Sequence, residues 1–276
     1  MKSRLFFLPL LMFVLAVPLL SQEPAPVWPK ANLNQSEQEF LKQAYDATAL
    51  VYTQNDGGDL IMACTATAVL KNDKGYSFLT AGHCMANNDL VYYLSDDKQD
   101  PKTFFKVDKA ACGIPAEGAD FCLMHVTTDR EFPVVAVGVS SESVAGEPAA
   151  SISSPLGLGK QTFRGFVAAP HLKRPVTLRD KDGKVKDKAD DKDKAAVVVG
   201  RWYDYTLFQM PGVNSASSGS ALLCMNQRAI CGVVVGILAT EAGHEAVALP
   251  INIVVEKLEG SALVYRTAPK TKAYKK

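Results

Sequence analysis

The chain has 276 residues, 47% of them hydrophobic, and a formal net charge of +1. This composition is typical of a globular protein with one large domain or two fused subdomains, and the length excludes a long multidomain array. The near-neutral charge gives no indication of a nucleic-acid partner, because such partners are bound by basic faces.

The N-terminus has the pattern of an export signal. A basic start at Lys2 and Arg4 is followed by an apolar run over residues 5–20, and Ser21 is a small residue at the position expected for cleavage. We predict a signal peptide over residues 1–21 and an exported protein, periplasmic or extracellular, without stable membrane association after signal removal. The alternative is an uncleaved anchor, for which the run is shorter than the roughly 20 residues that span a bilayer.

A linker and one short helix follow the signal. Residues 22–30 are polar and rich in proline, and residues 36–47 have helical spacing with Ser36 placed to cap the first turn. We therefore assign residues 22–47 to a linker and an N-terminal helix.

Beyond residue 50 the pattern changes to short runs rich in Val, Ile, Tyr, Phe and Thr, each closed by Gly, Asn, Asp or Pro. Strands without helices between them favour an antiparallel sandwich or barrels over a parallel sheet. The predicted strands are 60–70, 76–80, 90–94, 104–107, 121–126, 134–137, 165–168, 196–199, 220–225 and 230–238.

Two polar segments carry no chemistry of their own. Lys and Asp alternate through residues 173–194, which predicts a solvated insertion loop over residues 170–196. Its Asp180-Lys181-Asp182-Gly183 fragment lacks the later ligands of a calcium loop, and the histidines have no metal-type spacing. We expect no cofactor and no metal, and we assign residues 263–276 to a basic tail.

Six cysteines in an exported chain favour disulfides, because the compartment is oxidising. Six cysteines allow fifteen pairings. Proximity along the chain suggests Cys64 with Cys84, Cys112 with Cys122, and Cys224 with Cys231. A competing interpretation is a cysteine hydrolase that uses one of these thiols with His83 or His125, and free thiols in the native protein would support it.

Three separated segments contain the residues of a Ser-His-Asp triad. Amide hydrolysis by serine needs a base that takes the hydroxyl proton and a carboxylate that orients the base. His83 follows two small residues at the end of an apolar run, and Asp120 begins another apolar run, where an acid needs a partner. Ser218 lies in a loop of small residues, 212–221, whose backbone N–H groups can converge on one point.

These segments, Thr80-Ala81-Gly82-His83-Cys84, Asp120-Phe121-Cys122-Leu123 and Ser218-Gly219-Ser220, resemble the three catalytic segments of trypsin-like serine proteases, in the same order. Residues 154–159 with 165–167, and 232–237 with 246–251, are similar to the Deg/HtrA-like branch; we expect no PDZ domain here.

The resemblance covers residues 47–260 and implies a fold. We expect an all-β protein of two antiparallel six-stranded β-barrels with the active site in the cleft between them and short N-terminal and C-terminal helices. The first barrel is assigned to residues 48–140 and the second to residues 141–262.

The resemblance also implies roles for residues around Ser218. The backbone N–H groups of Ala216 and Ser218 are expected to form the oxyanion hole, although the family usually has glycine at the positions of Ala216 and Ser220. Ser217 replaces the aspartate that pairs with a new N-terminus in trypsin-type zymogens. We therefore expect activity without a trypsin-style activation cleavage.

The specificity pocket is expected to be apolar. Gly212 stands where relatives that prefer Lys or Arg have an acid, and Val213, Val235, Gly236 and Ile237 are the other expected pocket residues. The sequence thus predicts a serine endopeptidase that cleaves polypeptides through an acyl-enzyme after a small or medium apolar residue. The alternative is a weakly active or inactive protease-like fold that binds a peptide or partner. The oligomeric state is left open.

Overall fold

The computed structural model describes most of the chain, in the ranges 26–54, 58–87, 90–96, 104–175, 202–214, 216–240, 243–260 and 263–267. The predicted signal peptide, residues 176–196 of the charged loop, the predicted strand 196–199 and the tail beyond residue 267 lie outside these ranges. Among the described residues, no helix combines the length and the apolar character needed to cross a membrane.

Helix α1 (Glu37–Ala47) confirms the predicted capping at Ser36. The Ser36 hydroxyl accepts a hydrogen bond from the N–H of Glu39 at 3.2 Å, and the Glu39 carboxylate accepts one from the N–H of Ser36 at 2.9 Å. This reciprocal box satisfies two donors that the first turn leaves free. The helix buries its Phe40 side and leads directly into the first strand.

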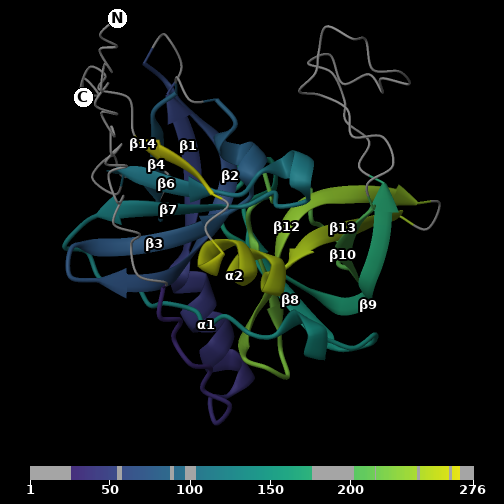
Figure 1. Ribbon diagram of the computed structural model, residues 1–276. Coiled ribbons are helices and arrows are strands. Elements are labelled where there is room, and N and C mark those ends of the chain that lie inside the picture. The colour runs from purple at the N-terminus through teal and green to yellow at the C-terminus, as the bar shows by residue number, and fades with distance from the viewer. Residues whose placement is uncertain are drawn as a thin grey trace, which may run out of the picture.

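The N-terminal β unit is a curled sheet of eight antiparallel strands, drawn mostly in blue and teal in Figure 1. Their order in the sheet is β14-β6-β7-β3-β2-β1-β4-β5. The bounds are β1 (Thr48–Gln54), β2 (Leu60–Asn72), β3 (Gly75–Thr80), β4 (Tyr92–Ser95), β5 (Phe104–Lys106), β6 (Lys109–Cys112), β7 (Cys122–Thr127) and β14 (Val264–Thr267).

This sheet has more strands than the six-stranded barrel implied by the resemblance. The additional edge strand is β14, which pairs with β6 from Val264 opposite Cys112 to Thr267 opposite Lys109. β14 lies within residues 263–276, which the sequence alone assigns to a basic tail. A run of four residues is too short for a periodicity that identifies an edge strand, and its pairing depends on a distant free edge.

The C-terminal β unit is a closed antiparallel barrel of six strands, as predicted, in the order β10-β13-β12-β11-β8-β9. Closure leaves no strand edge unpaired, and side chains such as Phe208 and Leu222 fill the interior. The bounds are β8 (Pro148–Ser153), β9 (Gln161–Pro175), β10 (Trp202–Gln209), β11 (Ala221–Cys224), β12 (Ala229–Thr240) and β13 (Gly243–Pro250). The predicted all-β class with two β units is confirmed.

The prediction of a strand at residues 134–137 is wrong. This segment crosses from the sheet to the barrel, and only Val137 forms a bridge, with Ile230. The N–H of Val135 donates to Ala68 of β2, and the carbonyl of Ala136 accepts from Ile230 of β12. The apolar run is therefore buried between two units instead of lying within one sheet.

The two units share one core. Helix α2 (Ile251–Glu259) lies between them in Figure 1, and its buried Ile251 and Val254 belong to a cluster with residues of both units. Asn252 of the same helix accepts from the N–H of Ser140 at 3.0 Å, in the segment that connects the units. A continuous core fixes the relative position of sheet and barrel, and hence the positions of the segments that carry His83, Asp120 and Ser218.

Candidate active site

His83 and Asp120 meet because their strands are neighbours. His83 lies in the 3-10 helix η1 (Gly82–Met85), which follows β3, and Asp120 precedes β7, which pairs with β3. One Asp120 oxygen accepts from the backbone N–H of His83 at 2.7 Å, and the other lies 2.8 Å from Nδ1 of the ring. The carboxylate therefore fixes both the backbone and the ring of the histidine through Nδ1, and Nε2 is the other ring nitrogen, as the predicted role of His83 requires.

A glycine makes this close approach feasible. A Cβ on Gly82 would lie 2.8 Å from Oδ1 of Asp120 and 3.0 Å from the backbone nitrogen of Phe121. The small residue that the sequence places before His83 is thus required by the space that the carboxylate occupies.

The protonation of His83 is controlled by its burial and by its pairing with Asp120. Burial favours the neutral imidazole, but the hydrogen bond and the negative charge of Asp120 outweigh burial and raise the pKa of His83 above its ordinary value. A base with this environment is neutral, and able to accept a proton, only on the alkaline side of that raised pKa.

All three proposed disulfides are present, and two of them flank this pair. Cys64–Cys84 joins β2 to the residue after His83, and Cys112–Cys122 joins directly opposed residues of β6 and β7, two residues after Asp120. All six cysteines are bonded, so the chain has no thiol that could serve as the nucleophile of a cysteine hydrolase.

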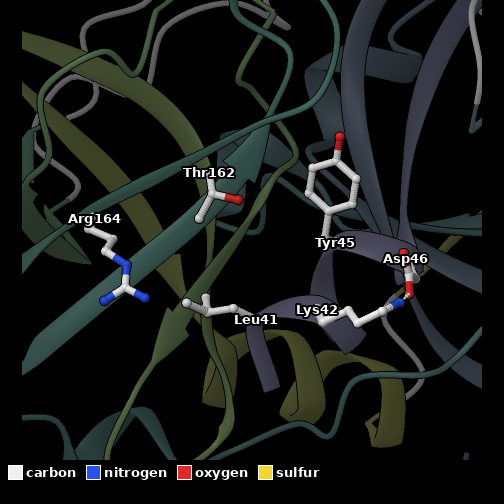
Figure 2. Close-up of a pocket in the computed structure, with 6 residues that line it drawn as sticks. All are labelled: Leu41, Lys42, Tyr45, Asp46, Thr162 and Arg164. Atoms are coloured by element: carbon white, nitrogen blue, oxygen red, sulfur yellow. Dashed lines mark hydrogen bonds and ion pairs between the residues drawn. The ribbon is translucent and has the colours of Figure 1, made fainter. Parts of the chain in front are cut away.

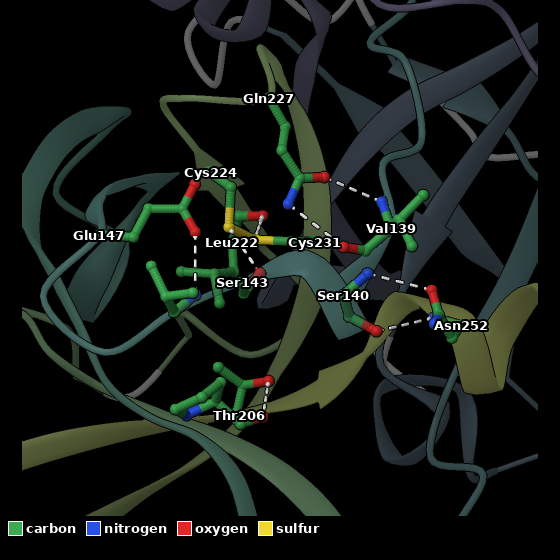
Figure 3. The surroundings of a disulfide bond; sticks show 12 residues. Val139, Ser140, Ser143, Glu147, Thr206, Leu222, Cys224, Gln227, Cys231 and Asn252 are labelled. Atoms are coloured by element: carbon green, nitrogen blue, oxygen red, sulfur yellow. Dashed lines mark hydrogen bonds between the residues drawn. A yellow bond between two sulfur atoms is a disulfide. The ribbon is translucent and has the colours of Figure 1, made fainter.

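The third disulfide, Cys224–Cys231, joins β11 to β12 and is shown with its surroundings in Figure 3. The hydroxyl of Ser143 lies 3.3 Å from Sγ of Cys224 and is the donor, because a disulfide sulfur carries no proton. This crosslink holds together the hairpin whose first strand follows the Ser218 loop.

Ser218 comes from the barrel and lies against the sheet beside His83. Its carbonyl accepts from the N–H of Thr65 in β2 at 2.9 Å. Thr65 follows Cys64, whose sulfur lies within 4.8 Å of a ring nitrogen of His83. The structure therefore brings the three predicted triad residues to one junction between the units.

Gly219 allows this contact between the two units. A Cβ on Gly219 would lie 2.1 Å from Oγ1 of Thr80 and 2.2 Å from the carbonyl oxygen of Thr65, and its φ is +84°. Both the space and the backbone conformation require glycine after Ser218.

The backbone N–H groups of the Ser218 loop fall into two sets. Those of Ser217, Gly219 and Ser220 donate to Asn214, Val234 and Ser217. Those of Ala216 and Ser218, the two expected oxyanion donors, have no hydrogen-bond partner among the described residues. Ala216 has φ +68°, so alanine adopts here the left-handed conformation that glycine adopts readily.

Neutral hydroxyl pairs anchor the same loop to β8. Ser153 donates to the buried Ser217 hydroxyl at 3.0 Å, and Ser217 Oγ also accepts from the N–H of Asn214. Ser151 donates to the buried Ser220 hydroxyl at 2.9 Å. Ser217 and Ser220, which with Ala216 depart from the family pattern expected from the sequence, thus form specific bonds inside the barrel.

A hollow of about 160 Å³ adjoins Ser218 and is lined by Val213, Asn214, Val234, Gly236 and Ile237. Three of the five expected pocket residues therefore line it. Val234 lines it in place of the expected Val235, at the point where the pairing of β12 with β13 shifts register between Val234 and Gly236. Gly212 is not a lining residue; its φ is +94° and it lies close against the ring of Phe163.

Asn214 and Thr65 were not singled out from the sequence. Asn214 follows the predicted pocket residue Val213, and its position in a small-residue loop was the available signal. Thr65 gave no signal, because its contacts with the Ser218 loop join residues about 150 positions apart.

A wider hollow of about 550 Å³ lies on another face, between α1 and β9, and is lined by Leu41, Lys42, Tyr45, Asp46, Thr162 and Arg164 (Figure 2). Lys42 pairs with Asp46, and Arg164 pairs with Glu37. The charged lining residues are thus engaged in ion pairs, and the catalytic candidate remains the Ser218 junction.

Comparisons with known proteins agree with this geometry. The family model described as a trypsin-like peptidase domain matches residues 64–237, which is more than half of the chain. Comparison with curated proteins gives no match.

Solved structures of the HtrA-type protease AlgW are similar in fold. The tripeptide complex is 18% identical with a TM-score of 0.53, and the match covers 83% of this chain and 64% of that chain. The decapeptide complex is 15% identical with a TM-score of 0.56, covering 83% of this chain and 69% of that chain. This chain thus spans about two thirds of the length of the AlgW structures.

Proposed function

We propose that this chain, which belongs to the trypsin-like peptidase family, is a serine endopeptidase with Ser218 as nucleophile, His83 as general base and Asp120 as the carboxylate that orients the base. The observation that carries the proposal is that the Asp120 carboxylate accepts hydrogen bonds from the backbone N–H and the ring of His83. Beside this pair lies a serine loop in which two N–H groups have no hydrogen-bond partner among the described residues.

The mechanism assigns one task to each group. Ser218 Oγ attacks the scissile carbonyl carbon while its proton passes to Nε2 of His83, and Asp120 stabilises the resulting imidazolium. The carbonyl oxygen becomes an oxyanion that accepts hydrogen bonds from the N–H groups of Ala216 and Ser218. The imidazolium then gives its proton to the leaving amine as the C–N bond breaks. Water, deprotonated by His83, hydrolyses the acyl-enzyme.

The substrate is a polypeptide with a small or medium apolar residue before the scissile bond. The hollow beside Ser218 is modest in volume, and its lining residues Val213, Val234 and Ile237 are apolar while none of the lining residues is charged. Kinetics with a peptide library varied at this position test the preference. An optimum at Lys or Arg would contradict it.

The proposed location is outside the cytoplasm, in the periplasm or the extracellular space. Three disulfides support an oxidising compartment. They add to the signal pattern at the N-terminus, whose cleavage can be measured by N-terminal sequencing of the mature protein.

The decisive experiment for the activity uses a fluorophosphonate probe, which reacts with activated serines. We expect stoichiometric labelling of the folded protein, loss of labelling in Ser218→Ala, and hydrolysis of an acyl-peptide p-nitroanilide that depends on the same residue. Folded protein that is neither labelled nor active would overturn the proposal.

A peptide-binding protein without activity is the second candidate, and one observation favours it. Ser218 Oγ has no hydrogen-bond partner among the described residues, so the bond to His83 is not made in this conformation. Such bonds often form only in the complex with substrate, which is why the endopeptidase remains the first candidate. Peptide binding without labelling or turnover would favour the binder.

A further inference from the structure

Thr65 forms hydrogen bonds with its backbone N–H, its hydroxyl and its backbone carbonyl, and the first two bind the Ser218 loop. Its N–H donates to the carbonyl of Ser218 at 2.9 Å, and its hydroxyl donates to the carbonyl of Ala216 at 3.0 Å. Its own carbonyl accepts from the hydroxyl of Thr80, three residues before His83, at 2.8 Å. The Thr65 side chain is fully buried, so these bonds form away from solvent.

We propose that the Thr65 hydroxyl clamps the turn that carries both oxyanion donors, which makes Thr65 a positioning residue of this active site. The inference rests on the proposed function, because it assigns Thr65 a role only if the N–H groups of Ala216 and Ser218 receive an oxyanion.

The first argument concerns the peptide plane between the two donors. The plane that joins Ala216 to Ser217 lies between the plane that carries the Ala216 N–H and the plane that carries the Ser218 N–H. Its carbonyl is held by the Thr65 hydroxyl and its N–H by the carbonyl of Asn214 at 2.9 Å. Rotation of this plane would redirect both donors, and the hydroxyl is the side-chain group that holds its carbonyl end.

The second argument concerns the conformation of Ala216. With its carbonyl fixed, the φ of Ala216 sets the direction of its own N–H. That φ is +68°, a value that residues with a Cβ avoid. A turn whose central residue prefers another conformation needs an external bond to stay in place. The Thr65 hydroxyl provides such a bond, and a side chain without a donor at position 65 does not.

Thr67 provides a matched comparison on the same strand. Its side chain is also buried and lies on the same face of β2, two residues along, yet its hydroxyl has no hydrogen-bond partner among the described residues. A general need for a buried threonine on β2 therefore predicts similar effects at both positions, whereas the clamp predicts an effect at Thr65 alone.

The test compares Thr65→Val, Thr65→Ser and Thr67→Val in the full chain, with a succinyl-tripeptide p-nitroanilide that has alanine or valine before the scissile bond. Rates are expressed per active site, counted by fluorophosphonate titration. We expect Thr65→Val to lower kcat about tenfold or more with little change in KM, because the loss falls on the transition state. Thr65→Ser keeps the donor and restores kcat to within about threefold, and Thr67→Val leaves kcat unchanged.

The effect of Thr65→Val on kcat can also be measured in the Ala216→Gly background. A merely structural role of Thr65 predicts the same effect in both backgrounds. Glycine adopts positive φ without strain, so the turn depends less on the clamp. We expect Thr65→Val to lower kcat less than about threefold in that background, which is a coupling between the two positions. Thr65→Ala, which removes the same hydroxyl, replaces Thr65→Val if the valine variant does not fold, and carries the same expected result.

The outcomes separate this inference from the function on which it rests. An active wild-type protein whose hydroxyl-deficient Thr65 variant keeps its kcat overturns the clamp alone. Equal losses in Thr65→Val and Thr67→Val also overturn it, because they indicate a general effect on β2. A wild-type protein without labelling and without turnover overturns the proposed function and the clamp together.

Discussion

The curled sheet holds His83 and Asp120 beside two covalent crosslinks, whereas the barrel holds the Ser218 loop with hydrogen bonds between uncharged side chains. Cys64–Cys84 and Cys112–Cys122 lie within two residues of His83 and Asp120. The loop of Ser218 is instead bonded to serines of β8 and to Thr65 of β2. The proposed base and its carboxylate are therefore positioned by the covalent structure of one unit, and the proposed nucleophile by hydroxyl contacts with both.

This difference indicates where the site is sensitive to change. Crosslinks restrict the chain even when nearby contacts are lost, because they limit the freedom of the unfolded state. A hydroxyl pair depends on the position of two side chains and loses its effect when either is removed. We therefore expect changes on the sheet side to act through the chemistry of His83 or through global stability, and changes on the barrel side to act through the Ser218 loop.

Asp120→Asn gives the largest expected effect, because it removes the negative charge beside His83. The disulfides hold the chain in place but cannot supply that charge. We expect kcat/KM to fall by about 10⁴-fold, since an amide can hold the imidazole in the wrong tautomer. In the wild-type protein burial lowers the pKa of His83, but the hydrogen bond and charge of Asp120 raise it further than burial lowers it. The acid limb of the profile of kcat/KM against pH therefore lies above the ordinary histidine value of about 6.5.

The profile of kcat/KM against pH also tests the direction in which Asp120 shifts the pKa of His83. In Asp120→Asn the residual activity should have its acid limb at lower pH, because burial then acts without the opposing charge. The stability that Asp120 gives to protonated His83 is present below about pH 6.5 and is lost as the pH rises through the raised pKa. Asp108→Asn, an exposed acid that binds the N–H of Thr127 in the same sheet, should leave both limbs unchanged. A value of kcat/KM within tenfold of wild type would exclude the assigned role.

Removal of Cys64–Cys84 tests the covalent side of the comparison. The bridge closes a loop with a sequence separation of 20, for which loop entropy predicts a loss of about 3 kcal/mol in the free energy of unfolding. The control pair Cys224 and Cys231, with a separation of 7, is expected to lose about 2.5 kcal/mol. Denaturant titration of the two alanine double variants measures both values.

The activities of these two variants should differ more than their stabilities. Cys84 directly follows His83, so its loss frees the helix turn that carries the base, whereas Cys224–Cys231 lies behind the Ser218 loop. We expect the first variant to have the lower kcat under conditions where both are folded. Equal kcat values would show that the crosslink stabilises the sheet without positioning the base.

The sheet side was also the side that the sequence predicted best. His83 and Asp120 stand in short contiguous motifs, and the space around each is set by neighbours along the chain, such as Gly82. The disulfides joined cysteines close in sequence. Local patterns therefore identified both the residues and the crosslinks that position them.

The barrel side depended on contacts that no local pattern contains. Val234 lines the pocket in place of Val235 beside a register shift in β12, and sequence alternation does not reveal where a bulge lies. The bond from Thr65 to Ala216 joins residues 151 positions apart. The sheet has one such case of its own, the edge strand β14, since its partner β6 is defined only by the folded sheet.

Ser217→Ala tests the hydroxyl contacts of the loop. The variant removes the acceptor for a buried bond from Ser153 and for a partly buried bond from the N–H of Asn214, and we expect the free energy of unfolding to fall by about 1–2 kcal/mol. The rate of fluorophosphonate labelling should fall with it, because Ser217 precedes the nucleophile. A double-mutant cycle with Ser153→Ala supplies the control: the two losses should not add, and strict additivity would show that the bond between the hydroxyls contributes nothing.

Glu147 is a buried acid on the barrel side, and Glu147→Gln is expected to have a smaller effect. The Glu147 side chain is shown beside the barrel disulfide in Figure 3, and one of its oxygens has no hydrogen-bond partner among the described residues. Burial raises the pKa of Glu147, although the N–H groups of Val144 and Asn226 oppose the shift. Because the folded pKa is raised, the protein is favoured at acidic pH and loses stability as the pH rises through that pKa.

Glu147→Gln should remove this dependence and raise stability at neutral pH. The measurement is the difference in free energy of unfolding between acidic and neutral pH for both proteins. Glu142→Gln, an exposed glutamate in the same connecting segment, should retain the wild-type difference. A variant less stable than wild type at neutral pH would indicate that the Glu147 carboxylate accepts a bond that the amide does not replace.

N-terminal trimming should have no effect on activity, and this expectation depends most directly on the uncharged character of the loop. Trypsin-type activation needs a carboxylate beside the nucleophile to pair with a new N-terminus, whereas Ser217 is buried and already bonded to Ser153. A new ammonium group at that place would be buried without a counter-charge, which is costly. Protein that begins at Val27, before α1, should therefore match the signal-processed protein in kcat/KM, and a large gain on trimming would show that the hydroxyl bonds alone do not assemble the site.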